Sequence, residues 1–231
     1  MGEKLLEVKN LTIGFPEENG MHTVVDNVSF TVGRGEIVGI VGESGSGKSM
    51  TVQTIMGLKK TDACVSSGEI LLNGKDLLKI SDEELSKIQG NDMSMVFQEP
   101  MTSLNPVKKI GWQVAESLKI HTSLPDTEIH RRVVEILSNV GLPKPEELCD
   151  KYPHQLSGGM RQRVMIAMAM ICWPKLLICD EPTTALDVTV QAQILQLLRK
   201  IHAEANTSIL FISHDLNVVK EVCQRQEKAW N

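Results

Sequence analysis

The chain has no long hydrophobic run. None of its segments approaches the ~20 apolar residues that a helix needs to cross a bilayer, and the longest candidate, residues 164–173, ends at Pro174. Its first residues do not combine a positively charged start with an apolar core, so we expect no export signal. Any membrane role is therefore expected to come through partner proteins.

Closely spaced cysteines, repeats and an excess of positive charge are also missing. The five cysteines form no close pair with metal-ligand spacing, which favours reduced thiols in a cytosolic protein. The net charge of −5 argues against a dedicated nucleic-acid surface. No repeat, low-complexity tract or long linker divides the 231 residues, of which 42% are apolar. We therefore expect one compact α/β unit with subdomains.

A glycine-rich loop is the first motif that carries chemistry. It lies between a predicted buried strand over residues 36–41 and a predicted helix over 48–56. Backbone N–H groups of such a loop converge on an anion, and the helix dipole favours the same anion. Lys48 is expected to reach the β- and γ-phosphates of a nucleotide, and the Ser49 hydroxyl to ligate Mg²⁺. The expected binding residues are Gly42, Ser44, Gly45, Ser46, Gly47, Lys48, Ser49 and Met50.

Two acidic residues end the apolar run 176–179. A carboxylate pair at the carboxyl end of a buried strand is costly unless a cation or a phosphate site uses it. Asp180 suits a Mg²⁺ shell, and Glu181, past the end of the run, can polarise an attacking water as a general base. A solvated turn before Pro182 is the alternative interpretation.

Another buried-strand pattern, residues 208–213, is followed by His214. A lone histidine is more often structural than catalytic. One at the carboxyl end of a parallel strand, however, lies on the ligand-binding edge of the sheet. We therefore expect His214 to contact the γ-phosphate.

A second glycine-rich cradle, residues 157–159, precedes a helix predicted over 160–172. Ser157 is expected to cap that helix and to form an anion site with its N-terminus. This site has no lysine or metal carboxylate of its own. One ATP is normally bound by one phosphate-binding loop of a chain. The second cradle therefore suggests that it contacts a nucleotide held by another copy, which predicts ATP-dependent dimerisation. The methionines of this helix indicate core packing rather than a cofactor site.

These motifs resemble, in order and spacing, those of the nucleotide-binding subunits of ATP-binding cassette (ABC) transporters. Residues 42–49 match the Walker A loop, 156–160 the signature, 176–181 Walker B and 185–187 the D-loop. His214 matches the switch histidine, and Gln98, after the strand-like residues 93–97, the Q-loop glutamine. The resemblance covers nearly the whole chain. It implies an α/β fold: a P-loop NTPase (RecA-like) core sheet with an antiparallel β subdomain and an inserted α-helical subdomain.

The resemblance also implies roles: ATP and Mg²⁺ as cofactors, and ATP hydrolysis coupled to solute transport. The catalytic residues implied are Lys48, Gln98, Glu181 and His214, and the metal ligands Ser49, Gln98 and Asp180. Further nucleotide contacts are implied for Phe15, Gln98, Ser157, Gly158, Gly159, Asp187 and His214. Of these, residues 157–159 clamp the γ-phosphate bound by the opposite subunit. Phe15, in a polar loop, occupies the place of the ring that stacks on adenine; simple burial is its alternative role.

Residues 97–106 and 152–163 are similar to the ATPases of bacterial dipeptide, oligopeptide and nickel importers. For the first stretch, a proline-bounded loop shared by many importers is the alternative. The implied partners are a second ABC ATPase subunit, identical or related, transmembrane permease subunits and, indirectly, a solute-binding protein. No nucleic acid is expected as a partner. The implied location is peripheral, at the cytoplasmic face of the cell membrane.

We expect a single ABC ATPase domain in three parts. The core and antiparallel β layer take residues 1–98, the helical subdomain about 99–163, and the core continuation about 164–231. Strands are expected over 5–13, 24–32 and 68–72, and helices over 82–89 and 188–204, as well as within 111–159. The polar end, 221–231, departs from the family pattern, so the cassette is expected to be shortened there, through truncation, a shifted reading frame or a naturally short variant.

Two other classes of function compete with the importer. One is a soluble ABC-type ATPase acting on nucleic acid or ribosomes, although such proteins usually carry two cassettes or a long coiled coil, neither of which is present here. The other is a truncated cassette that binds ATP without efficient hydrolysis. Stimulation of ATPase activity by nucleic acid would support the first, and absence of turnover with partners present the second.

Overall fold

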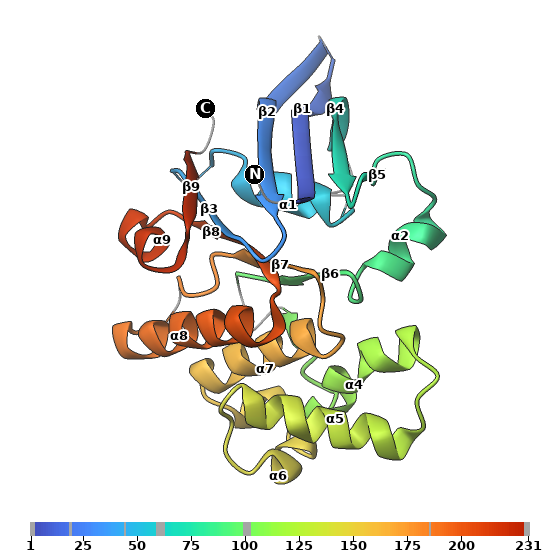
Figure 1. The fold of residues 1–231 in the computed structure, drawn as a ribbon, viewed down its shortest axis with the longest axis vertical. Helices are drawn as coiled ribbons and strands as arrows, with labels where there is room; N and C mark the ends of the chain where they lie inside the picture. Colours follow the sequence, from blue (N-terminus) through green and yellow to red (C-terminus); the bar gives the residue numbers. More distant parts are fainter. Residues whose placement is uncertain are drawn as a thin grey trace.

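The computed structural model describes residues 3–18, 20–43, 45–58, 63–98, 103–184 and 186–228. Ser44 of the first cradle, residues 99–102 and Ala185 lie outside these ranges, as do the predictions made for them. Figure 1 shows an antiparallel sheet, a central sheet and a layer of helices, one above the other. Within the described ranges no helix combines the length and apolar character needed to traverse a bilayer.

The central sheet is parallel and buried. In spatial order its strands are β6 (Met93–Val96), β7 (Leu176–Asp180), β8 (Ser208–Ser213), β3 (Ile37–Val41) and β9 (Arg225–Lys228). All neighbouring strands run parallel. Every residue of β6, β7 and β8 is buried, as expected for a sheet that is covered on both faces. The four strands predicted from apolar runs are confirmed.

The second sheet is antiparallel, as predicted. Its strands, in spatial order, are β2 (Gly20–Gly33), β1 (Lys4–Glu17), β4 (Cys64–Leu72) and β5 (Lys75–Asp76). Asn73 and Gly74, with φ of 50° and 78°, form the two-residue turn between β4 and β5. The prediction that Phe15 lies in a loop is wrong. Phe15 continues β1 and pairs with His22 of β2, because cross-strand pairing extends both strands beyond their apolar cores.

The helices cover the central sheet on both faces. They are α1 (Lys48–Ile55), α2 (Asp82–Ile88), α4 (Ile110–His121), α5 (Asp126–Asn139), α6 (Pro145–Cys149), the 3₁₀ turn η1 (Pro153–Gln155), α7 (Gly158–Met170), α8 (Val188–Ala205) and α9 (Leu216–Val222). The predicted caps are confirmed: Ser157 accepts a hydrogen bond from Met160 N, and Asp187 from Val190 N. The capping box of Ser81 and Glu84 is also present. In Figure 1, α4 to α7 form the layer farthest from the antiparallel sheet. The domain boundaries at residues 98 and 163 stay a prediction.

Alternate residues of the central strands enter two different hydrophobic cores. Leu177 and Cys179 of β7 pack in the cluster that includes α4, α5, α7 and α8. Leu176 and Ile178 pack in the cluster that includes α1 and the antiparallel sheet. This alternation follows from the two-residue period of a strand. The central sheet is therefore anchored on both faces, which fixes the position of its carboxyl edge.

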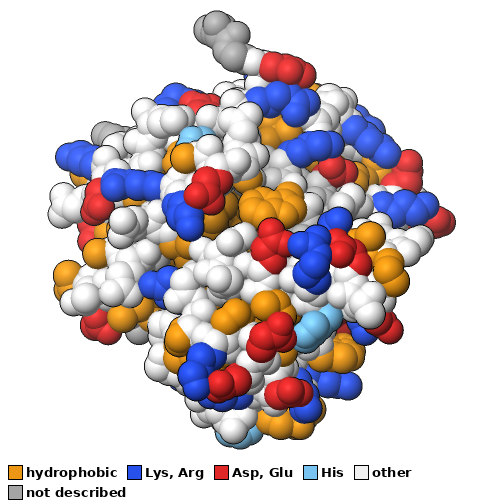
Figure 2. All heavy atoms as spheres, turned by 60° about the horizontal axis from the view of Figure 1, so that its bottom comes forward, with side chains coloured by type: hydrophobic (Ala, Val, Ile, Leu, Met, Phe, Trp, Pro, Cys, Tyr) orange, Lys and Arg blue, Asp and Glu red, His pale blue; other side chains and the backbone are white. Residues whose placement is uncertain are grey.

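Charges of both signs are interspersed over the surface of the helical layer, as the view in Figure 2 shows. Many of them are paired: Arg131 and Arg132 both contact Glu128, and Lys109 contacts Asp150. Hydrogen bonds from the two arginines lower the pKa of Glu128 to about 2. Such exposed pairs contribute little stability individually.

Strand β9 was not predicted, because its sequence is polar. The Arg225 side chain connects this edge strand to the rest of the fold. Its Nε donates to Glu36 Oε1 at 2.8 Å, and its Nη2 donates to the Thr31 carbonyl. Glu36 also accepts a hydrogen bond from Gly33 N at 2.7 Å. The guanidinium hydrogen bond lowers the pKa of Glu36, against the opposite effect of partial burial.

Replacing Arg225 with alanine is expected to lower the free energy of unfolding by about 1–2 kcal/mol at pH 7, because Glu36 loses a charged, partly exposed partner. The stability that the Arg225–Glu36 pair contributes is complete above 4.5, the pKa of Glu36 in the unfolded chain. It is lost as the pH falls through the lower pKa of Glu36 in the folded protein. Urea unfolding of parent and variant from pH 7 to pH 3 measures the difference. Gln226→Ala, exposed on the same strand, is the control. A difference independent of pH would contradict the assignment.

Candidate functional site

The predicted motifs meet at the carboxyl edge of the central sheet. The first cradle follows β3, Asp180 ends β7, His214 follows β8, and Gln98 lies two residues after β6. Because these strands are parallel neighbours, their ends meet at one edge. A hollow of about 450 Å³ lies there, lined by Val24, Gly45, Gly47, Lys48, Ser49, Met50, Gln98, Glu181, Thr184 and His214.

The cradle has backbone geometry that needs glycine. Gly45 and Gly47 have φ of 87° and 78°, in the left-handed region. A Cβ on Gly47 would lie 2.6 Å from Val25 Cγ2. The loop is closed by Ser46, whose Oγ donates to the Glu43 carbonyl at 2.9 Å. This loop leads directly into the N-terminus of α1, where backbone N–H groups favour an anion.

The Lys48 side chain bends back over the cradle. Its Nζ donates to the carbonyl oxygens of Gly42 and Glu43 at 2.7 and 2.5 Å, and to Ser46 Oγ at 3.3 Å. The residue is only 5% exposed. Its partners are neutral oxygens rather than a carboxylate, so its charge remains available to an anion in the hollow.

Ser49 and Asp180 bring two oxygen ligands together. Ser49 Oγ donates to Asp180 Oδ1 at 3.1 Å, and burial raises the pKa of Asp180 against the opposite effect of that hydrogen bond. A hydroxyl and a carboxylate are hard oxygen donors that suit Mg²⁺, which usually keeps waters and phosphate oxygens as its other ligands. Within the described ranges, no cluster of three acidic, histidine or cysteine side chains could hold a metal alone. The pair thus fits a magnesium ion that arrives with a nucleotide.

Three side chains contact one oxygen of Glu181. Thr184 Oγ1 donates to Glu181 Oε2 at 2.8 Å, Gln98 Nε2 donates to it at 3.3 Å, and His214 Nδ1 lies 3.1 Å from it. Glu181 has a left-handed backbone, with φ of 46°, and its N–H donates to the Ile212 carbonyl at 3.0 Å. The Glu181 side chain lines the hollow, whereas the neighbouring Asp180 side chain does not.

Several predicted residues lie away from this hollow. The second cradle is at the N-terminus of α7, where Ser157 and Gly158 are exposed, and a Cβ on Gly158 would meet nothing within 4 Å. Asp187 caps α8, and Phe15 does not line the hollow. Sequence reasoning missed Val24 and Thr184, which line it. The spacing of Thr184, three residues after Glu181 in a proline turn, could have indicated the contact.

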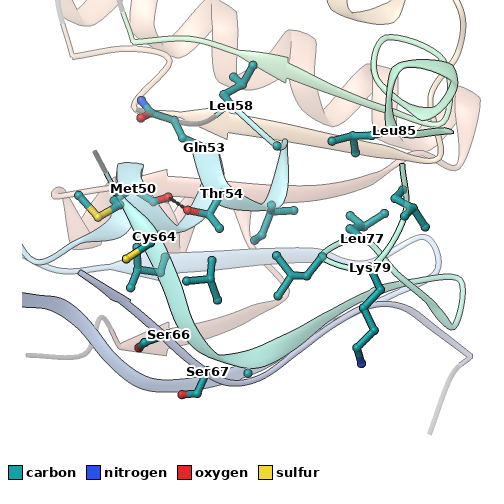
Figure 3. A pocket seen from close by; sticks show the side chains of 18 of the residues that line it. Met50, Gln53, Thr54, Leu58, Cys64, Ser66, Ser67, Leu77, Lys79 and Leu85 are labelled. Carbon is teal, nitrogen blue, oxygen red and sulfur yellow. Dashed lines mark hydrogen bonds between the residues drawn. The ribbon is translucent and has the colours of Figure 1, made fainter. Parts of the chain in front are cut away.

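A larger pocket of about 620 Å³ lies between α1 and β4. Figure 3 shows Met50, Gln53 and Thr54 of α1 on one side, and Cys64 and Ser66 of β4 on the other. Its walls are largely apolar, with Leu58, Leu77 and Leu85 among them. Its lining includes neither the glycine-rich loop 42–49 nor the carboxylates of Asp180 and Glu181, so it does not suit a triphosphate.

Comparisons with known proteins agree with this geometry. The family described as "ABC transporter" matches residues 25–184. The oligopeptide transport ATP-binding protein AppD of Bacillus subtilis (strain 168) is 52% identical over 222 residues, which are 96% of this chain and 68% of that protein. The dipeptide transport ATP-binding protein DppD of the same organism is 50% identical over 224 residues, with 96% and 67% covered. This chain therefore spans about two thirds of the length of these relatives.

A solved structure is also similar. It is described as the dimeric structure of a post-hydrolysis state of the ATP-binding cassette MJ0796 bound to ADP and Pi. The TM-score is 0.85 at 30% sequence identity, covering 97% of this chain and 94% of that chain. The similarity therefore extends over both sheets and the helical layer.

Proposed function

This chain belongs to the ABC transporter family, and we propose that it binds MgATP and hydrolyses it as the ATP-binding subunit of a bacterial peptide importer. The observation that carries the proposal is the meeting of Lys48, the Ser49–Asp180 pair and Glu181 at one sheet edge. The first cradle supplies phosphate recognition, and the carboxylates supply the metal site and a base. These groups together are what phosphoryl transfer to water needs.

In the proposed mechanism, Lys48 leaves its backbone carbonyls and binds the β- and γ-phosphates. Ser49 and Asp180, with Gln98 nearby, would hold Mg²⁺, which supplies positive charge at the phosphates. Glu181 accepts a proton from the water that attacks the γ-phosphate in line, and His214 contacts that phosphate. ADP leaves as the bond between the γ-phosphorus and the oxygen that bridges to the β-phosphate breaks. Positioning and charge supply most of the rate enhancement.

The second cradle indicates that a dimer completes the site. Ser157 and Gly158 are exposed and do not line the hollow, so we infer that they do not bind the phosphates held in their own protomer. We infer that residues 157–159, with Asp187, contact the nucleotide held by the opposite protomer, and that Phe15 stacks on adenine. The similar MJ0796 cassette is described as dimeric. ATP would then act as the link between two facing cassettes.

The similar proteins favour peptides over nickel as the cargo, and transport over work on nucleic acid or ribosomes. Both reported relatives are named for peptide transport. We therefore propose a second ABC ATPase and transmembrane permease subunits as direct partners, and a solute-binding protein as an indirect one. The complex would place this chain at the cytoplasmic face of the cell membrane.

Affinity isolation from the native membrane, followed by identification of the retained proteins, tests this proposal. We expect a permease and a second ATPase to be retained, and the isolated complex to hydrolyse ATP faster when peptide and its binding protein are supplied. Retention of ribosomal or DNA-binding proteins, with ATPase activity stimulated by nucleic acid, would overturn the importer function.

A further inference from the structure

We propose that Thr184 is a positioning residue for hydrolysis, which holds one oxygen of Glu181 so that the other faces the attacking water. The inference rests on the proposed ATPase function and extends it to a residue that does not touch the phosphates. It is carried by the hydrogen bond of 2.8 Å from Thr184 Oγ1 to Glu181 Oε2, the closest of the three contacts to that oxygen.

The backbone of Glu181 explains why its side chain needs such a restraint. Residues other than glycine, asparagine and aspartate rarely adopt a left-handed φ, and Glu181 has φ of 46°. The turn that follows is closed by a hydrogen bond from Thr184 N to the Glu181 carbonyl at 3.4 Å. Thr184 therefore reaches back over the residue that it orients, and both lie on the same turn.

Thr184 differs from the other two residues that contact Oε2. Gln98 and His214 follow other strands, and both are proposed to contact the nucleotide or its metal, so their bonds to Glu181 compete with those contacts. Among the described residues, the Thr184 hydroxyl makes no hydrogen bond other than the one to Glu181 Oε2. Its hydroxyl can therefore keep Oε2 in place after Gln98 and His214 turn to the substrate.

The second oxygen, Oε1, is the one left for chemistry. Among the described residues, no hydrogen bond reaches Glu181 Oε1. During hydrolysis the water oxygen forms a bond to the γ-phosphorus, the bond to the β-phosphate oxygen breaks, and the water proton moves to Oε1. A carboxylate fixed through Oε2 presents Oε1 in one orientation, whereas a free one rotates away from the water.

The test uses full-length protein in its membrane complex. Thr184→Val removes the hydroxyl at nearly constant volume, and Thr184→Ser retains it. We expect Thr184→Val to lower kcat about tenfold, the loss of one hydrogen bond to a charged group, with KM for ATP within about twofold. Thr184→Ser should keep kcat within about twofold of the parent. Thr127→Val, the same change at an exposed position of α5, should match the parent.

A double variant separates positioning from folding. In a Glu181→Gln background, Thr184→Val should lower the residual kcat no further, because the group it orients no longer accepts a proton. Parent-like kcat for Thr184→Val, or equal losses for the valine and serine variants, would overturn the inference. Failure of the proposed function is distinguishable, since it would show as absent ATP turnover in the parent complex.

Discussion

Replacing Lys48 with alanine is expected to weaken ATP binding about a hundredfold, because two or more charge-assisted contacts to phosphate are lost. Lys48 is buried at the cradle, and its Nζ donates to the Gly42 carbonyl and to Ser46 Oγ of that loop. Among the described residues, Lys48 is the only lysine or arginine that lines the hollow, and alanine offers no positive charge in its place. Equilibrium titration with a fluorescent ATP analogue measures the change.

The matched control is Lys87→Ala on α2, where the lysine side chain is 70% exposed and pairs with Glu83. It should bind ATP like the parent. Thermal unfolding without nucleotide should be similar for both variants, which separates ligand contact from folding. An Lys48→Ala protein with parental ATP affinity would remove the phosphate-binding role from the first cradle.

Glu181→Gln is expected to lower ATP turnover about a thousandfold while ATP still binds, because an amide cannot accept the water proton. The glutamine has nearly the same shape, so the cradle and the Ser49–Asp180 pair should remain intact. Phosphate release measures turnover, and retention of radiolabelled ATP measures binding. The prediction follows from the placement of the Glu181 carboxylate at the hollow.

Glu83→Gln is the control for this change, since Glu83 is 81% exposed on α2. It should leave turnover unchanged. If Glu181→Gln protein hydrolysed ATP at the parental rate, the base would be another group, and the Thr184 inference would fail with it.

Strands with apolar sequences could be predicted well, whereas strands with polar sequences could not. Residues 208–213 form a strand with the predicted bounds, since burial on both faces of a parallel sheet requires an unbroken apolar sequence. Arg225–Lys228 was missed because an edge strand gains its main-chain pairing from a neighbour, here β3, without an apolar pattern of its own. Phe15 was placed in a loop for the same reason: its strand is extended by pairing with β2.

The site residues could be predicted where residue type and position in a motif determine the chemistry. Lys48, Ser49 and Asp180 follow from motif spacing and strand ends, and the structure brings them together. Thr184 could not be found in this way, because its contact depends on the left-handed backbone of Glu181. That residues 157–159 do not line the hollow likewise depends on tertiary structure.

A structure of the Glu181→Gln complex with ATP and its native partners would show whether ATP joins two cassettes. We expect Ser157 of one protomer to lie within hydrogen-bond distance of the terminal phosphate bound at its partner's first cradle. A complex with both nucleotides bound, in which Ser157 still faces solvent, would rule out ATP as the link between the cassettes.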